Sequence, residues 1–187
     1  EGVVVRSRVK IDREFMDVHF FKVVARNSNS KTATTTLQIN VEDINDNTPQ
    51  FEHKIYNTTV REALEIGSQI TTVQANDIDL KENGRVSYHL STDDEMFRMD
   101  PATGILYLRN KLDREVQENH VLTVIARDNA VPSAQLSSSA TINVRVLDDN
   151  DNHPAFTRRI YYFDVMEDID WRSNPEIGNV TATDDDQ

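Results

Sequence analysis

The stretch 43–51, DINDNTPQF, places two aspartates and two asparagines within five residues and follows them with a proline. Two carboxylates about 4 Å apart repel by about 4 kcal/mol at an effective dielectric near 20, so their close packing requires a cation. The stretch 148–156, DDNDNHPAF, has Asp, Asn, Asp, Asn, Pro and Phe at the same offsets, 105 residues later. A period of this length indicates whole domains in tandem rather than a solenoid of small units.

The repetition continues inside the units. The sequence IDRE at 11–14 matches LDRE at 112–115, and VARN at 24–27 matches IARD at 125–128, both at a spacing of 101 residues. The change in spacing falls in one connection, where an insertion is tolerated easily. We therefore predict three units: the C-terminal half of a repeat at 1–47, a complete repeat at 48–152, and the N-terminal part of a third at 153–187. The two partial units cannot bury full cores by themselves.

Short strands separated by turn residues are predicted within the units. Apolar and polar residues alternate at 37–41 and 141–146, which is typical of half-buried strands, and no convincing amphipathic helix is found. Further β-rich runs lie at 86–90, 105–108 and 121–126. About 100 residues per unit and several short strands favour an all-β, antiparallel, immunoglobulin-like sandwich.

The composition limits the classes of partner. A net charge of −12 with 20 scattered Lys and Arg residues argues against nucleic acid and favours cations. The absence of cysteine excludes disulfides and thiolate zinc sites. No apolar run is long enough for a membrane span and no signal-peptide pattern is present, so we expect an internal segment. Sequons at Asn57 and Asn179 would be usable only in a secreted chain.

Acidic residues recur at turn positions within the units. Calcium takes six to eight oxygen ligands from carboxylates, amides, backbone carbonyls and water, and Asp and Asn are suited to it. The recurring positions are Glu62 with Glu167, Asp77 and Asp79 with Asp184 and Asp186, Asp12 and Glu14 with Asp113 and Glu115, and Asp128 in the complete unit. Together with the two acidic runs, they predict calcium sites at the borders between units.

With these motifs in this order, the sequence resembles tandem extracellular cadherin repeats over its whole length. The resemblance implies a seven-stranded Greek-key sandwich in each complete repeat and three Ca²⁺ ions at each junction. For the first junction it implies two ions held by Asp12, Glu14, Asp43, Asp46, Asp79 and the Ile44 carbonyl, and a third held by Asn45, Asp77, Asp79, Asp128 and the carbonyls of Asn47 and Asn83.

For the second junction the resemblance implies an equivalent set of ligands. They are Glu62, Asp113, Glu115, Asp148, Asn150, Asp151, Asp184, Asp186 and the carbonyls of Asp149 and Asn152, and Glu167 would serve the third repeat as Glu62 serves the second. Asn27 stands where the family has aspartate, so we expect the junction before residue 1 to bind its third ion weakly or not at all.

The same residues allow other interpretations. Acidic side chains are often only a solvated surface, and an EF-hand is excluded because neither run has its glycine and glutamate positions. Asp113 with Glu115 could imitate a hydrolase pair, but we expect no enzyme. The histidines lack metal-ligand spacing, and Trp171 is expected to pack in a loop.

The resemblance implies a calcium-dependent cell–cell adhesion receptor. We expect the segment to lie in the extracellular region of a single-pass plasma-membrane protein, anchored through a part not present here. Its partners would be other cadherin ectodomains, homophilic or heterophilic. The alternative is a non-adhesive structural or signalling spacer in a large cadherin-related protein.

Overall fold

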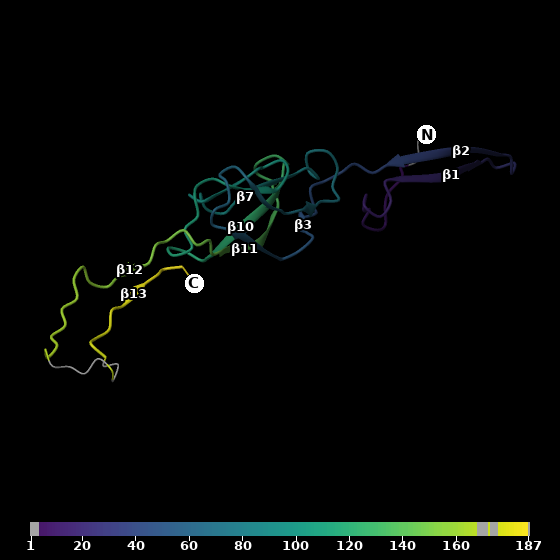
Figure 1. Ribbon diagram of the computed structural model, residues 1–187. Coiled ribbons are helices and arrows are strands. Elements are labelled where there is room, and N and C mark those ends of the chain that lie inside the picture. Colours follow the sequence, from purple (N-terminus) through teal and green to yellow (C-terminus); the bar gives the residue numbers. More distant parts are fainter. Residues whose placement is uncertain (1–3, 168–171, 173–175, 187) are drawn as a thin grey trace.

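The computed structural model describes residues 4–167, 172 and 176–186, which form an elongated, all-β molecule (Figure 1). A hairpin lies at one end, a sandwich in the middle and a small C-terminal pair of strands at the other end. Among the described residues, none belongs to an α-helix, and no helix could therefore cross a membrane. Trp171 lies outside the described residues.

The central sandwich lies within 48–152. One sheet has the strand order β4-β11-β10-β7, a second has β5-β9-β8, and β3 pairs with β6. The strands are β3 (Gln50–Phe51), β4 (Ile55–Arg61), β5 (Gln69–Thr72), β6 (Ala75–Asn76), β7 (Val86–Leu90), β8 (Phe97–Met99), β9 (Ile105–Leu108), β10 (Asn119–Asp128) and β11 (Ser137–Leu147).

The core of the sandwich follows from residue alternation. In β10 and β11, every second residue is buried, because successive side chains point to opposite faces of a sheet. Val124 and Ile142 are fully buried and pack with Phe97 and Leu106 from the facing sheet. The strands predicted at 86–90, 105–108, 121–126 and 141–146 are therefore confirmed.

The first and last long strands of the sandwich are neighbours. β11 pairs antiparallel with β10, whereas β4 pairs with β11 in parallel, with Tyr56 opposite Ile142 and Val60 opposite Val146. This pairing brings the start and the end of the sandwich into one sheet, so the loops that leave it lie at opposite ends of the same layer.

The flanking segments are open structures. β1 (Val18–Arg26) and β2 (Thr32–Asn40) form an antiparallel hairpin, and β12 (Ala155–Phe156) pairs with β13 (Ala182–Thr183). Phe21 on β1 is 49% exposed, whereas Leu122, at the matching position of β10, is buried. The exposed aromatic agrees with the expectation that a partial repeat cannot bury its own core.

Candidate metal centres at the junctions

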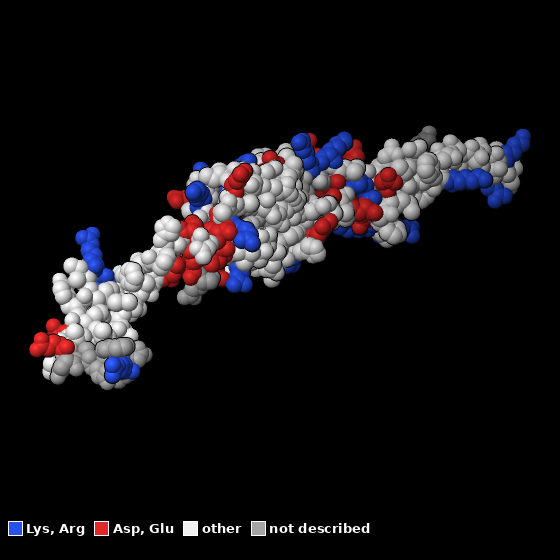
Figure 2. Space-filling view, in the orientation of Figure 1, with Lys and Arg blue, Asp and Glu red and all other residues white. Residues whose placement is uncertain are grey.

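Acidic side chains gather at the two ends of the central sandwich. Figure 2 shows Asp and Glu concentrated where the sandwich meets the N-terminal hairpin and where it meets the C-terminal segment. These places correspond to the two acidic runs and to the loops that face them. The loops are joined to rigid strands, so each carboxylate is held by the fold and not by the acidic run alone.

Three carboxylates converge at the first junction. Glu14, Asp46 and Asp79 each offer an oxygen, and these oxygens all lie within 4.8 Å of one another. They come from the turn before β1, the linker after β2 and the loop after β6. Asp79 is only 6% exposed. Carboxylates this close are mutually repulsive, and a shared cation relieves the repulsion.

An amide clamp joins the linker to the loop of the complete repeat. The backbone N–H of Asn47 donates to Oδ2 of Asp79 at 3.1 Å, and its side-chain Nδ2 donates to Oδ1 at 2.7 Å. The second junction repeats both bonds, from Asn152 to Asp186, at 2.9 and 2.8 Å. The recurrence shows that the two junctions share one local geometry.

A second polar group lies deeper at the first junction. Asp128 is fully buried and accepts hydrogen bonds from the Leu136 N–H at 2.8 Å and from Asn45 Nδ2 at 2.9 Å. Oδ1 of Asn45 and Oδ2 of Asp77 are buried without a hydrogen-bond donor. Buried acceptors without donors are rare and call for an ion or water. Both oxygens therefore fit a cation.

The environment of Asp77 disfavours its charge. Burial, followed by the negative charges of Asp79, Asp128 and Asp43, raises the pKa of Asp77 above its usual value. Its Oδ1 accepts a hydrogen bond from the Asp79 N–H at 3.0 Å, which partly opposes this effect. A divalent cation beside these groups would reverse the unfavourable repulsion.

Two further carboxylate groups form at the second junction. Oxygens of Glu62, Glu115 and Asp151 lie within 4.8 Å of one another, and so do those of Glu115, Asp148 and Asp186. Glu62 is 6% exposed. It is held by hydrogen bonds to Oε1 from the Asp149 N–H at 2.7 Å and to Oε2 from the Arg114 N–H at 2.9 Å.

Several of the expected ligands have other contacts or remain outside these groups. Asp12 and Asp113 cap turns, accepting from the N–H groups of Phe15 at 3.2 Å and Val116 at 2.9 Å. The side chain of Asp149 pairs with Arg61 at 2.9 Å. The Ile44 carbonyl accepts from the Asp46 N–H at 3.0 Å. Outside the carboxylate groups found among the described residues are also Asn83, Asn150, Glu167 and Asp184, of which all but Asn83 are exposed.

Asp43 contacts protein groups through both of its oxygens. Oδ1 lies 2.6 Å from Nε of Arg13, and Oδ2 accepts from Asn83 Nδ2 at 2.9 Å and from the Leu80 N–H at 3.1 Å. Burial alone would raise the pKa of Asp43, but these hydrogen bonds and the positive charge of Arg13 outweigh it and lower the pKa. The carboxylate is therefore a charged link between segments.

Sequence reasoning missed the arginines between the acidic positions. Arg13 lies beside Glu14 and donates from Nη2 to the carbonyl of Ile78 at 2.8 Å. Arg114 of the LDRE motif has matching contacts at the second junction. The available signal was the repeated Asp-Arg-Glu order, in which the arginine recurs as regularly as the acids.

Comparison with known proteins decides the family. A family model described as "Cadherin domain" matches residues 56–147. Protocadherin-like wing polarity protein stan of Drosophila melanogaster is 38% identical, across 98% of this chain and 6% of that protein. Cadherin EGF LAG seven-pass G-type receptor 2 of Mus musculus is 36% identical, also across 98% of this chain and 6% of the receptor.

The chain belongs to the cadherin superfamily. Solved cadherin structures share its fold: mouse cadherin-23 EC22-24 has a TM-score of 0.85 at 29% identity, covering 96% of this chain and 57% of that one. Mouse protocadherin-24 EC1-3 has a TM-score of 0.84 at 25% identity, covering 95% and 59%. The chain is thus a cadherin-type ectodomain segment built of tandem Greek-key sandwiches, and it spans about 6% of the curated relatives named above.

The family agrees with the chemistry of the junctions. Cadherin domains generally bind Ca²⁺, and the oxygen-only sets described above are of the kind this ion prefers. Glu14, Asp46 and Asp79 would hold it at one junction, and Glu62, Glu115 and Asp151 at the other. The proteins named in the comparisons are cadherins, protocadherin-like proteins and cadherin-type receptors by their names.

Proposed function

We propose that this segment is part of a calcium-dependent cell–cell adhesion ectodomain, in which Ca²⁺ at the repeat borders stiffens the rod. The repeats are taken as 1–47, 48–152 and 153–187, with the metal residues assigned in the sequence. The observation that carries the proposal is the convergence of carboxylates from both sides of a border, Glu14 and Asp46 with Asp79.

The proposed stiffening follows from linkage. Without a cation, the converging carboxylates repel across the border, and the aligned arrangement loses free energy. Calcium modules outside the cell bind at about 10⁻⁴ to 10⁻³ M, so one site at ten-fold excess ligand contributes about 1.4 kcal/mol. Three independent sites would contribute about 4 kcal/mol, which is comparable with the stability of a marginal domain.

A spacer role is the second candidate. The chain spans about 6% of the relatives it matches, so a segment of this size could serve mainly to separate adhesive repeats elsewhere in a long ectodomain. In that case the calcium sites would keep the same mechanical purpose, and no partner would bind residues 1–187. For the leading candidate, the partners would be other cadherin ectodomains, either of the same or of a different kind.

The location of the parent protein is proposed from the family. We place the segment outside the cell, in a protein anchored in the plasma membrane through another part of its chain. The sequence reading expected a single span, whereas the names of the mouse receptor and several other relatives describe seven-pass proteins. We therefore propose a membrane-anchored parent protein, with either one span or seven.

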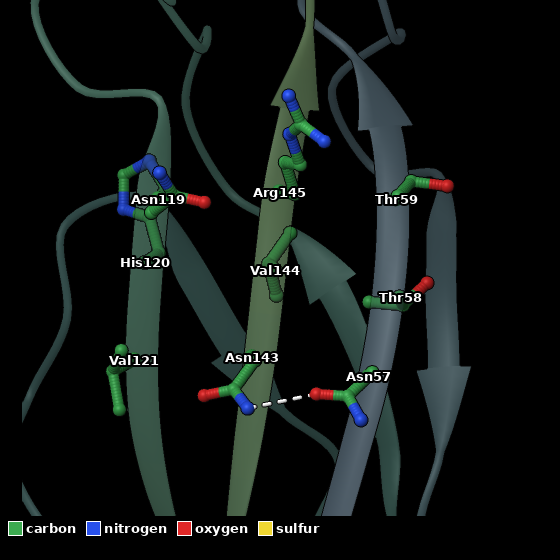
Figure 3. Close-up of a pocket in the computed structure, with 9 residues that line it drawn as sticks. All are labelled: Asn57, Thr58, Thr59, Asn119, His120, Val121, Asn143, Val144 and Arg145. Carbon is green, nitrogen blue, oxygen red and sulfur yellow. Dashed lines mark hydrogen bonds between the residues drawn. The ribbon is translucent and has the colours of Figure 1, made fainter.

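Asn57 is suited to carry an N-linked glycan. It projects from the outer face of β4, where Asn143 donates from Nδ2 to its Oδ1 at 2.8 Å (Figure 3). The amide nitrogen of Asn57, the atom that a glycan occupies, points away from this bond. Asn179 is also exposed. A mass shift after treatment of the secreted protein with an N-glycosidase would test both positions.

Two measurements test the proposed function: the shape of the protein in solution and its ability to bind a second copy of itself. The chain, extended so that both end repeats are complete, should give a longer and stiffer particle in small-angle scattering when millimolar calcium replaces chelator. Beads coated with the same protein should then aggregate only with calcium. An unchanged particle would contradict the calcium mechanism, and a stiffened particle without aggregation would favour the spacer role.

A further inference from the structure

The four-stranded sheet of the central sandwich has an open edge along β4. This strand pairs with β11 on one side and with no strand on the other. The carbonyl of Lys54 and the N–H of Glu62, at the two ends of β4, both bond to β11, at 3.0 and 3.1 Å. Because successive residues of a strand alternate in direction, the backbone groups of Asn57 and Thr59 face away from β11. Within the described part of the chain, no other segment bonds to the backbone of these two residues.

The other edges of the sandwich are short, irregular or covered. At the opposite edge of the same sheet, the Tyr88 N–H in the centre of β7 donates to the Pro101 carbonyl at 2.9 Å. β5 has four residues and an irregular register between Gln69 and Thr71, β8 has three residues, and β3 and β6 have two each. Such edges do not pair readily with another chain. β4 has seven residues in continuous register with β11, so it lacks these protections.

The sequence of β4 favours pairing with a further strand. Residues 55–60, IYNTTV, include no charged residue, no proline and no glycine. Ile, Tyr, Thr and Val are common in strands, and a short uncharged segment of this kind on an exposed edge is prone to edge-to-edge association. Charges stand only at the two ends, at Lys54 and Arg61, and Arg61 is paired with Asp149 at 2.9 Å. The centre of the edge has no charge to oppose pairing.

The sequon lies at the centre of this edge. Asn57 begins the triplet Asn-Thr-Thr and is exposed on the outer face of β4. The bond from Asn143 Nδ2 turns Oδ1 of Asn57 toward β11, as Figure 3 shows. The nitrogen on the other arm of the planar amide therefore points away from β11, to the side where the sheet has no further strand. Asn143 is in this way a positioning residue for a group attached to Asn57.

We propose that an N-linked glycan on Asn57 shields the open edge of β4 and prevents edge-to-edge association between copies of the protein. The inference rests on the extracellular location and on the modification of Asn57 proposed above. A strand added to β4 would lie about 4.8 Å from it, in the space that the innermost sugars occupy. The glycan is bulky and hydrophilic, so it protects β4 as a covering loop protects β7.

The test compares self-association with and without the sugar. The protein is the chain extended so that both end repeats are complete, secreted from cells that attach N-glycans. Mass spectrometry of the peptide that contains Asn57 establishes whether the site is occupied. Sedimentation velocity is then recorded over a range of protein concentrations in chelator, so that calcium-dependent adhesion does not contribute. Amide hydrogen exchange locates the contact.

Four variants separate the shield from other causes. Asn57→Gln and Thr59→Ala each abolish the sequon and should self-associate about ten-fold or more tightly than the parent, because two paired edges share several backbone hydrogen bonds. The added protection from hydrogen exchange should lie in β4. Asn57→Lys also lacks the glycan but places a charge on the edge, so it should remain monomeric. Thr181→Ala abolishes the other sequon, outside the central sandwich, and should match the parent.

Three results would overturn the shield. An unmodified Asn57 in the secreted parent shows that no glycan covers the edge. Self-association of Asn57→Gln and Thr59→Ala no tighter than that of the parent shows that the glycan is not what keeps the edges apart. Equally tight self-association of Asn57→Lys or Thr181→Ala shows that a loss of solubility, and not an open edge, is the cause. The aggregation of beads in calcium tests the proposed adhesion separately, and its failure would leave these results in chelator unchanged.

Discussion

Replacing Asp46 with asparagine removes one of the three carboxylates that converge at the first junction. The substitution keeps the size of the side chain at an exposed position, so the variant is expected to fold as the parent does. Two opposite effects are expected. In chelator the variant is relieved of repulsion from Glu14 and Asp79, and in calcium it has lost a charged ligand.

The magnitudes follow from the geometry. Unit charges 4.8 Å apart repel by about 3.5 kcal/mol at an effective dielectric of 20. The Asp46 side chain is 39% exposed and has Lys10 at 3.9 Å, so the relief in chelator should be no more than about 1 kcal/mol. If calcium affinity falls about ten-fold, a site at ten-fold excess calcium drops from about 1.4 to about 0.4 kcal/mol.

The assay is thermal unfolding in chelator and in millimolar calcium. A difference of 1 kcal/mol corresponds to about 4–8 °C for a domain of this size, so the calcium-induced rise in Tm should shrink by that amount. In chelator, the Tm of Asp46→Asn should equal or exceed that of the parent. Asp93→Asn, at a side chain 93% exposed and far from the acidic run in sequence, is the matched control. An undiminished calcium-induced rise in Asp46→Asn would refute the assignment of Asp46 as a ligand.

Three further outcomes are expected. Because the pKa of Asp77 is raised above 3.8, protons compete with calcium for this carboxylate at a higher pH than usual. Calcium affinity measured by calorimetry should therefore decline as the pH is lowered toward that raised pKa. The part of the decline that is due to Asp77 should be absent in Asp77→Asn. Burial lowers the pKa of His120 below 6.5, so the unfolded chain binds the proton more readily than the folded chain does. The free energy of unfolding, measured with urea, should therefore fall as the pH drops below about 6.5. The fall should be smaller in His120→Gln. Val124→Ala should cost about 2–3 kcal/mol of unfolding free energy because the side chain is fully buried, whereas Val121→Ala, 71% exposed on the same strand, should cost under about 0.5 kcal/mol; equal costs would contradict the packing of β10.

The sandwich was largely predictable because its strands alternate cleanly. The alternation of residues 141–146 marks β11, and its pattern can be read without knowing its neighbours. The parallel pairing of β4 with β11 could not be predicted in this way. This pairing places Tyr56 opposite Ile142, at the other end of the repeat in sequence. The alternation of residues within one strand does not indicate which distant strand pairs with it.

The candidate site was likewise predictable in part: the ligand positions follow from the motif, whereas the contacts of Asp43 do not. Motif order predicts Glu14, Asp46 and Asp79 as ligands, and the structure brings their carboxylate oxygens together. For Asp43 the motif indicates only that an acidic residue occupies the position, and not which groups it contacts. Its engagement by Arg13 and Asn83 depends on two loops meeting in space, and residue type alone does not distinguish a metal ligand from a salt-bridge partner.

The parallel neighbours β4 and β11 have a consequence for a protein under mechanical load. Tension along the rod enters the sandwich at the N-terminal end of β4 and leaves at the C-terminal end of β11. Since the two strands run in the same direction, these forces slide one past the other, and the hydrogen bonds from Ile55 to Arg61 share the load at once. An antiparallel terminal pair pulled from one end would open bond by bond. The order of strands thus makes the central sandwich resist pulling along the rod in shear.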